Sequence, residues 1–307
     1  MCILFLYFCD KPTPNGYRLI MASNRDEFYF RPTARADFWE ENPNIIAGID
    51  LEPGKEGGTW LGMNKDGKFG VITNYRQAPK FMNRQALGRG HLVPDFLKGD
   101  STVKDYLQDV NNAGDNYNGF NLLVGKLSLT EESRVGWYCN IEERVITMLR
   151  PGIHVLSNKV LNCPWPKMVY GKERFGNILN EASTKQELID KLIEMLNMRE
   201  RSFICGDANS FIGGIDLSET GQDHDMLPVR RSTFTVYSTM ASSYRTNTVV
   251  LVDATGHATY VERTLEDDAT DPDEAEWRLS THEFDIQDEC GCHDENHNIS
   301  VVFNSSL

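Results

Sequence analysis

The start of the chain decides the fold, because residues 2–28 read CILFLYFCDKPTPNGYRLIMASNRDEF. Ile3 to Phe8 is an apolar run of strand length, and a stretch rich in turn-forming residues separates it from a second apolar run, Tyr17 to Ala22. The pattern predicts a β-hairpin. Because both runs are apolar almost throughout, we expect burial on both faces, as in a sheet that is covered by another layer.

The rest of the chain predicts more strands than helices. Thr59 to Met63 and Phe69 to Thr73 flank an Asp-Gly pair, which suits the tight turn of a second hairpin. Further runs with strand character are Phe120 to Gly125, Arg134 to Cys139, Arg144 to Leu149, His154 to Ser157, Phe234 to Thr239, Thr248 to Asp253 and Ala258 to Glu262.

Three segments predict helices. Lys185 to Asn197 carries an apolar stripe at helical spacing, and Thr184 with Glu187 forms a capping box at its start. Ser101 to Val110, with Ser101 as its cap, and Pro166 to Asn180, with a proline in the first turn, complete the set. Antiparallel strand pairs with helices inserted between them indicate an α+β protein built in layers.

Length and charge limit the classes of function. The chain has 307 residues and 31 Lys+Arg against 45 Asp+Glu, so its net charge is 31 − 45 = −14. This charge argues against a protein that binds the nucleic-acid backbone, which needs a basic surface. From Glu266 to Glu289 there are eleven acidic residues and one basic residue, so this segment alone carries 1 − 11 = −10. We expect it to be loosely attached, with Trp277 and Phe284 as isolated anchors.

Cysteine use indicates a reduced compartment. Seven cysteines are an odd number, and the sequence shows no secretory signature, so a disulfide framework is not expected. No apolar run approaches the ~20 residues that span a bilayer. Cys290, Cys292, His293 and His297 are weak metal-ligand candidates, because they lack the second well-spaced ligand pair of a zinc finger.

Cys2 is the first residue that could perform chemistry. If the initiator Met is removed, Cys2 carries a thiol and a free α-amine, whose pKa is ~7.7–8.0 in an ordinary environment. Such an amine can take the proton of the thiol, so base and nucleophile share one residue. The alternative is that Cys2 is a small buried residue that begins a strand.

Two charged residues follow the second strand. A cation such as Arg25 stabilises a nearby thiolate, and a carboxylate such as Asp26 holds an ammonium group in place. The alternative is that Asp26 caps a helix that runs into residues 28–30.

Three further features lie at strand ends. Asn74 and Asn158 each follow an apolar run, and side-chain amides can donate to a developing oxyanion, although such residues are also common in turns. The glycines of Gly57 to Gly62 do not form a phosphate-binding loop, since they lack its Lys and do not open a helix. We expect them to let another backbone or a ligand come close.

Several motifs together resemble one family, the transport and Golgi organisation protein 2 homologues, which are named after an Asn-Arg-Asp-Glu motif. From residue 1 to about residue 263 the matching segments are Met1-Cys2 before a strand, Asn24 to Glu27, Gly57 to Gly62, Asn118 to Leu123, Leu156 to Asn158 and Tyr244 to Asp253. The resemblance implies an amino-terminal-nucleophile-hydrolase-like αββα sandwich of two antiparallel sheets. It also implies one domain over residues 1–265, with residues 266–307 as an acidic carboxy-terminal extension.

The same resemblance extends to the bile-salt and penicillin V acylases. Carried over by motif, their catalytic pattern falls on Cys2, Arg25, Asp26, Asn74, Asn158 and Arg245. In those acylases the Arg and the Asp are separated in sequence, whereas here they are adjacent. We expect the six residues to converge on one site.

The family is linked to haem mobilisation from organelles and to acyl-coenzyme A and lipid homeostasis, in cytoplasm, mitochondria and Golgi. The resemblance therefore implies a ligand handler that needs no cofactor, carries haem or an acyl-coenzyme A as cargo, and associates peripherally with organelles. The alternative is an amidohydrolase or thioesterase that uses Cys2 and acts on an acylated small molecule. We rank ligand handling first.

Overall fold

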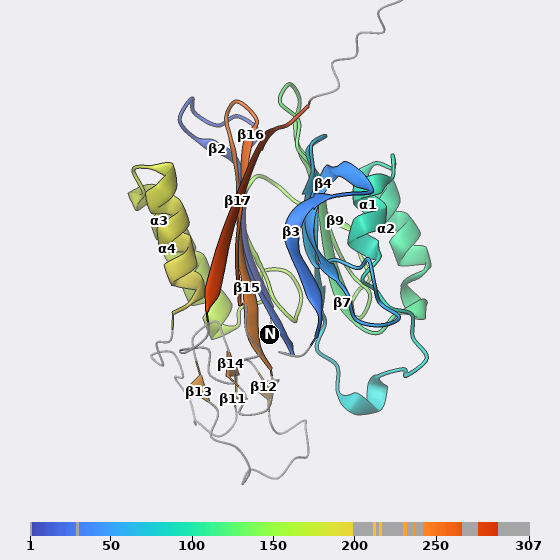
Figure 1. Cartoon of the computed structure of the whole chain (residues 1–307). Helices are drawn as coiled ribbons and strands as arrows, with labels where there is room; N and C mark the ends of the chain where they lie inside the picture. The colour runs from blue at the N-terminus through green and yellow to red at the C-terminus, as the bar shows by residue number, and fades with distance from the viewer. Residues whose placement is uncertain are drawn as a thin grey trace, which may run out of the picture.

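Two antiparallel sheets stack face to face, and a pair of helices covers the outer face of each (Figure 1). The computed structural model describes residues 2–28, 31–198, 242–265 and 276–287, together with four two-residue strands, β11 (Phe211–Ile212), β12 (Ile215–Asp216), β13 (Arg230–Arg231) and β14 (Val236–Tyr237). The four-layer αββα arrangement confirms the predicted fold class.

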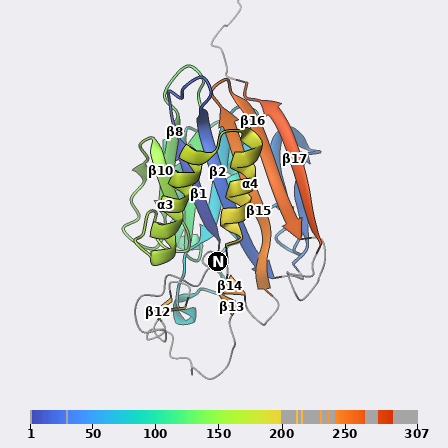
Figure 2. The same ribbon diagram turned by 90° about the vertical axis from the view of Figure 1, so that its left-hand side faces the viewer.

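The six-stranded sheet has the predicted hairpin near its centre. Its order is β10 (Gly152–Leu156), β1 (Ile3–Phe8), β2 (Tyr17–Phe28), β15 (Ser242–Asp253), β16 (His257–Leu265) and β17 (Trp277–Asp285). Helices α3 (Pro166–Glu181) and α4 (Lys185–Leu196) lie across it, as Figure 2 shows. Both helices have the predicted positions, and Thr184 caps α4 by accepting a hydrogen bond from the amide of Glu187.

The seven-stranded sheet follows chain order. Its strands are β3 (Thr33–Trp39), β4 (Asn42–Asp50), β5 (Leu61–Asn64), β6 (Lys68–Asn74), β7 (Phe120–Lys126), β8 (Arg134–Cys139) and β9 (Thr147–Met148). Helices α1 (Leu92–Lys98) and α2 (Val103–Asn112) cover it, and the short 3-10 helices η1 (Pro79–Phe81) and η2 (Gly114–Asn116) lie in its connections. The cap of α2 is Thr102 and not Ser101, because the Thr102 hydroxyl accepts from the amide of Asp105.

Side chains of the first hairpin point alternately to the two faces of the sheet and pack into two separate cores. Leu4, Leu6 and Phe8 enter the layer between the sheets, whereas Ile3 and Phe5 pack against α3 and α4. This division explains why the run is apolar throughout, and it confirms the expected burial on both faces.

The expected loose attachment of the acidic segment is wrong for residues 276–287. β17 pairs with β16 along its whole length, from His257 opposite Asp285 to Leu265 opposite Trp277. Phe284 is only 8% exposed and belongs to the core between the sheets. An edge strand leaves alternate side chains in solvent, so a high net charge does not prevent it from pairing.

The predicted boundary after residue 265 therefore does not hold for β17. Cationic neighbours offset part of its charge, because the ammonium of Lys185 lies 2.6 Å from Glu283 and the guanidinium of Arg263 stacks 4.0 Å from the Trp277 ring. Residues 266–275 and 288–307, which include Cys290, Cys292, His293 and His297, lie outside the described residues.

Candidate functional site

Cys2 and Arg25 lie at the same end of the first hairpin. Ile3 pairs with Asn24, so Cys2 stands one residue before β1 and Arg25 one residue further along β2. This is the lower end of the sandwich in Figure 1. The Cys2 thiol is free and half-buried, and the carbonyl of Cys2 accepts a hydrogen bond of 2.9 Å from the Ser157 hydroxyl.

Asn74 and Asn158 meet at this end, although they come from different sheets. The Asn158 side-chain amide donates to the Asn74 carbonyl over 2.8 Å, and the Thr73 hydroxyl donates to the Ser157 carbonyl over 2.7 Å. Asn158 is 7% exposed. Ser157, which precedes Asn158 in the chain and accepts from the neighbour of Asn74, donates to the Cys2 carbonyl, so both amide residues lie near Cys2.

Arg25 lies between the sheets. Its guanidinium stacks 4.0 Å from the Trp60 ring and lies 3.7 Å from the carboxylate of Glu27. A second acid, Glu262, is buried nearby, where it accepts from the amide of Ala36 over 2.8 Å. Burial raises the pKa of Glu262, and the charge of Arg25 opposes that rise. Glu27 is therefore a carboxylate partner of Arg25 within the protein.

Asp26 belongs to a strand and not to a helix start, so the helix-cap alternative is wrong. β2 continues through Phe28, and Tyr244 pairs with Asp26. Because side chains alternate along a strand, Asp26 shares the helix-covered face with Asn24 and not the inner face with Arg25. Its carboxylate oxygens are buried.

Asn24 fixes the sheet to α4. Its side-chain amide donates to the carbonyl of Leu196 over 2.9 Å, and its oxygen accepts from the side chain of Asn247 over 2.6 Å. Leu196 ends α4, where the carbonyl groups have no partner within the helix. The first residue of the Asn-Arg-Asp-Glu motif is therefore a connector between two layers.

Arg245 lies in β15 beside these residues in the sheet. Thr246 pairs with Arg25 and Tyr244 with Asp26, so Arg245 is the additional residue of a β-bulge between them. The backbone thus brings Arg245 to the same end of the sheet as Cys2, and its side chain lies outside the described part of the structure.

Three cations that the sequence did not single out surround this end. The side chain of Arg89 donates from Nε to the Asn74 side-chain oxygen over 2.9 Å, and the amide of Arg76 donates to the Asn158 carbonyl over 2.9 Å. Lys167 stands in the first turn of α3. Arg89 and Lys167 are half-buried, and both interact electrostatically with Cys2.

Burial disfavours the charge of these cations. It lowers the pKa of Lys167 to about 8, with Cys2 acting in the opposite direction and Arg76 adding to the effect. Burial also lowers the pKa of Arg89, against an opposing effect of Cys2. An anion bound beside Arg89 and Lys167 would favour their charged forms and so oppose the effect of burial. A signal for part of the cluster was present in the sequence, because residues 76–90 hold four basic residues and no acidic one.

The glycines before β5 allow one segment to approach closely, as expected. The amide of Thr59 donates to the carbonyl of Gly90 over 3.0 Å. A Cβ atom on Gly58 would lie 3.2 Å from the Cα atom of Gly90, which is tighter than ordinary van der Waals contact. This approach places Arg89 near Cys2.

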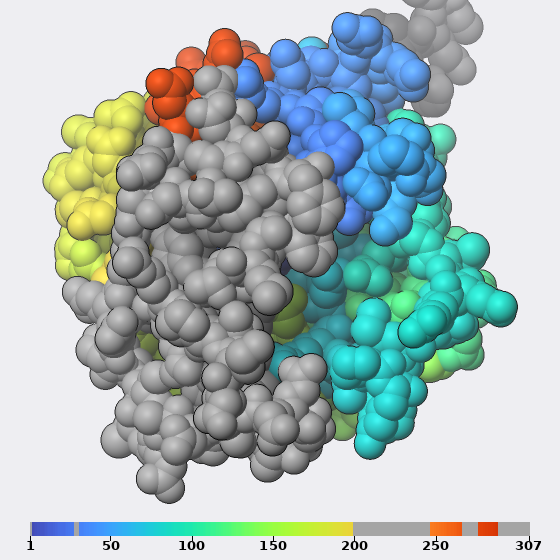
Figure 3. All heavy atoms as spheres, turned by 60° about the horizontal axis from the view of Figure 1, so that its bottom comes forward, coloured from blue at the N-terminus to red at the C-terminus, as the bar shows by residue number. Residues whose placement is uncertain are grey.

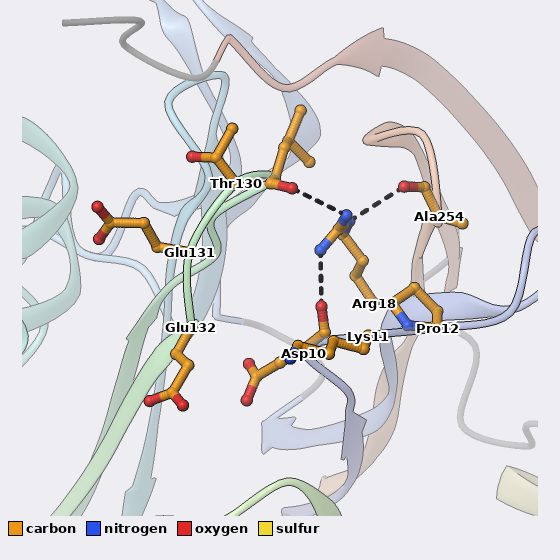
Figure 4. A pocket seen from close by; sticks show the side chains of 9 residues that line it. Asp10, Lys11, Pro12, Arg18, Thr130, Glu131, Glu132 and Ala254 are labelled. Carbon is orange, nitrogen blue, oxygen red and sulfur yellow. Dashed lines mark hydrogen bonds between the residues drawn. The ribbon is translucent and has the colours of Figure 1, made fainter.

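A cavity of about 390 Å³ lies at the end of the first hairpin opposite to Cys2 (Figure 4). Asp10 and Lys11 follow β1 there, and Arg18 lies near the start of β2. The Arg18 guanidinium donates to the carbonyls of Asp10, Ser128, Leu129 and Ala254. Arg18 is therefore engaged in joining turns.

Metal-ligand clusters and membrane-spanning helices were sought among the described residues. Among them, no group of three or more His, Cys, Asp or Glu side chains is arranged to hold a metal ion. Within the same residues, no helix has the length and apolar character needed to cross a bilayer.

Comparisons with known proteins assign a family. A mutant of conjugated bile acid hydrolase from Clostridium perfringens is similar at 8% identity, over 95% of this chain and 100% of that one, with a TM-score of 0.42. The transport and Golgi organization 2 homologues of Mus musculus and Homo sapiens are each 39% identical, over 94% of this chain and 100% of their own length. The family model described as Transport and Golgi organisation 2 matches residues 1–267. The chain belongs to this family.

Proposed function

We propose that the protein binds an anionic small molecule at the Cys2 end of the sandwich and hands it on inside the cell. Haem is the first candidate ligand, mobilised from organelles, and an acyl-coenzyme A is the second. Membership of a family named for transport supports the handing-on role.

The observation that carries the proposal is the pair of half-buried cations, Arg89 and Lys167, beside Cys2. Arg25 has a carboxylate partner in Glu27, and burial lowers the pKa of both Arg89 and Lys167. A carboxylate or phosphate would restore a favourable environment for both cations. Haem presents two propionates and coenzyme A presents phosphates, so both ligands match this chemistry.

Hydrogen bonds hold the Arg89 side chain in place. Asn74 accepts from Arg89, and Asn158 donates to the backbone of Asn74, so the cation is oriented before a ligand arrives. Preorganisation of this kind reduces the entropy that binding would otherwise consume. Arg89 is therefore held in position for an anionic ligand.

A titration with haemin and with palmitoyl-coenzyme A tests the proposal. Arg89→Gln and Lys167→Gln should each weaken binding of at least one of the two ligands about tenfold, the scale of one charge-assisted hydrogen bond. Lys104→Gln is the matched control, because Lys104 is exposed on α2. Binding that is unchanged in both site variants would refute the proposal.

The second candidate function is hydrolysis with Cys2 as nucleophile. It is favoured by one observation, the hydrogen bonds that fix the Cys2 carbonyl and bring the buried Asn158 to it through Ser157. After removal of Met1, the α-amine would take the thiol proton, sulfur would attack the acyl carbonyl, and a side-chain amide would donate to the oxyanion. The amine proton would pass to the leaving group, and water would then cleave the acyl-enzyme.

Mass spectrometry of the protein from its own cells separates the two functions. A carrier should be recovered with an intact non-covalent ligand, and a hydrolase should show a free Cys2 amino terminus and an acyl adduct on Cys2 when mixed with a thioester. An adduct that is absent from Cys2→Ala would favour hydrolysis.

A further inference from the structure

We propose that residues 76–90, here called the basic loop, form a docking surface for an anionic lipid bilayer beside the Cys2 end of the sandwich. The loop links β6 to α1 and contains η1. This inference does not depend on the identity of the ligand or on the chemistry of Cys2.

The first observation is apolar exposure. Phe81, Met82 and Leu87 are 67%, 52% and 55% exposed, and all three belong to this loop. Single exposed apolar residues are ordinary, but three large ones within seven positions of one loop are a concentrated patch. In Figure 1 the cyan segment that holds η1 projects beyond the end of the sheets, and Figure 3 shows its cyan surface at the rim of the molecule.

The second observation is charge. The basic loop carries four basic residues and no acidic one, so its charge is +4 in a chain whose net charge is −14. The four are Arg76, Lys80, Arg84 and Arg89, and none forms an ion pair within the described part of the chain. Basic side chains interleaved with exposed apolar ones match the headgroup and acyl boundary of an anionic membrane.

The third observation is that the loop is held in shape. The amide of Asn83 donates to the side chain of Asn118 over 2.8 Å, and Asn118 donates back to the Asn83 carbonyl over 2.9 Å. The amide of Leu87 donates to the Asn116 carbonyl over 2.8 Å. Because these contacts fix the base of the loop, its apolar side chains are presented without the ordering cost of a mobile segment.

The geometry also connects the surface to the site. Arg89 is the last basic residue of the loop and holds the side chain of Asn74 beside Cys2. A bilayer on the loop would therefore lie close to the cations that face Cys2. This arrangement fits a protein that takes up an amphipathic anion from a membrane surface.

Sedimentation of the full chain with lipid vesicles tests the inference. The protein should bind vesicles of phosphatidylcholine with phosphatidylserine and should bind pure phosphatidylcholine much more weakly. Near an anionic surface each Lys or Arg contributes about fivefold in affinity, so Lys80→Gln with Arg84→Gln should lose about 25-fold. Binding should also weaken as salt is raised.

Apolar contact is tested separately. Phe81→Ser with Met82→Ser should lower vesicle binding at least tenfold, whereas the control pair Val145→Ser with Leu279→Ser should not, although both control residues are more than half exposed. The charge control is Lys104→Gln with Lys172→Gln, on exposed positions of α2 and α3. All substituted side chains are on the surface, so melting temperatures should stay within a few degrees.

Three results would overturn the inference. One is wild-type protein that does not bind the anionic vesicles. Another is vesicle binding that the loop variants retain at wild-type strength. The third is vesicle binding that depends on charge but is unaffected by the Phe81 and Met82 substitutions, which would show that the loop does not insert apolar side chains into the bilayer.

Discussion

Substitution of Lys167 by Gln gives a quantitative test of the cationic site, because the lowered pKa of Lys167 sets a pH window. With a pKa of about 8, the amine is about nine-tenths protonated at pH 7 and about one-tenth protonated at pH 9. A ligand that needs the ammonium should therefore bind about tenfold more weakly at pH 9 than at pH 7. The Gln variant should show no such dependence over this interval.

The same shift predicts an effect on stability with a definite sign. An unfolded lysine keeps its proton up to ~10.4, whereas folded Lys167 loses it near pH 8, so the unfolded chain binds more protons between these values. Stability should then rise with pH across this window, by at most about 1.4 kcal/mol per pH unit. Below pH 8 the Gln variant should be the more stable protein, by up to about 3 kcal/mol, and by less where water reaches the half-buried amine.

Two measurements check this reasoning. Ligand affinity is followed by calorimetry in two buffers of different ionisation enthalpy, which also counts the protons taken up when an anion binds. Urea unfolding of both proteins from pH 7 to pH 10 gives the difference in stability, and Lys104→Gln controls for the loss of a surface charge. An affinity that is equally sensitive to pH in both proteins, together with no pH-dependent difference in stability, would refute the lowered pKa and its cause.

Other predictions concern the fold and Cys2. Phe284→Ala should lower the free energy of unfolding in urea by about 2–4 kcal/mol, because Phe284 belongs to the core. Leu279→Ala on the same strand should lower it by less than about 0.5 kcal/mol, because Leu279 is exposed. Equal effects would mean that β17 is not part of the core. Gly58→Ala should cost about 1 kcal/mol and weaken ligand binding, because its Cβ meets the backbone of Gly90; unchanged affinity in a binding titration would contradict the coupling. Cys2→Ala should fold normally and substantially rescue haem distribution in a null cell if the protein is a carrier, and a complete loss of rescue with folding and affinity intact would contradict that function.

Local patterns predicted the centre of the fold. The first hairpin, the hairpin across Gly67 and the helices α3 and α4 all form where periodicity and turn residues placed them. These elements bury both faces or a continuous stripe, so their sequences carry a strong signal.

Weaker elements depend on their neighbours. β3 alternates poorly, and its pairing with β4 shifts register twice, so no simple period marks it. β17 is an edge strand whose acidic side chains face solvent, and only its backbone ladder and Phe284 reveal it as part of the sheet. Composition alone could not distinguish such a strand from a solvated tail.

In the candidate site, too, local sequence patterns predicted some residues, whereas others depend on contacts between distant parts of the chain. Strand ends were expected to supply Asn74 and Asn158, and a hydrogen bond from the Asn158 side chain to the Asn74 carbonyl joins them in the structure. Lys167 could not be found in this way, because its proximity to Cys2 depends on how α3 packs over the first hairpin, some 160 residues away in sequence. Its roles, like those of the six residues carried over by motif, stay predictions.

The adjacency of Arg25 and Asp26 bears most directly on the choice between carrier and hydrolase. Alternation in β2 directs Arg25 to the inner layer, where it stacks on Trp60, and places Asp26 on the helix-covered face. By the same alternation Cys2 precedes Ile3 of the helix side and shares the inner side with Leu4. The side chains of Arg25 and Asp26 therefore approach the Cys2 end of the sheet from opposite faces. Arg89 and Lys167 both interact electrostatically with Cys2, and binding of an anion by these two cations is what our carrier proposal predicts.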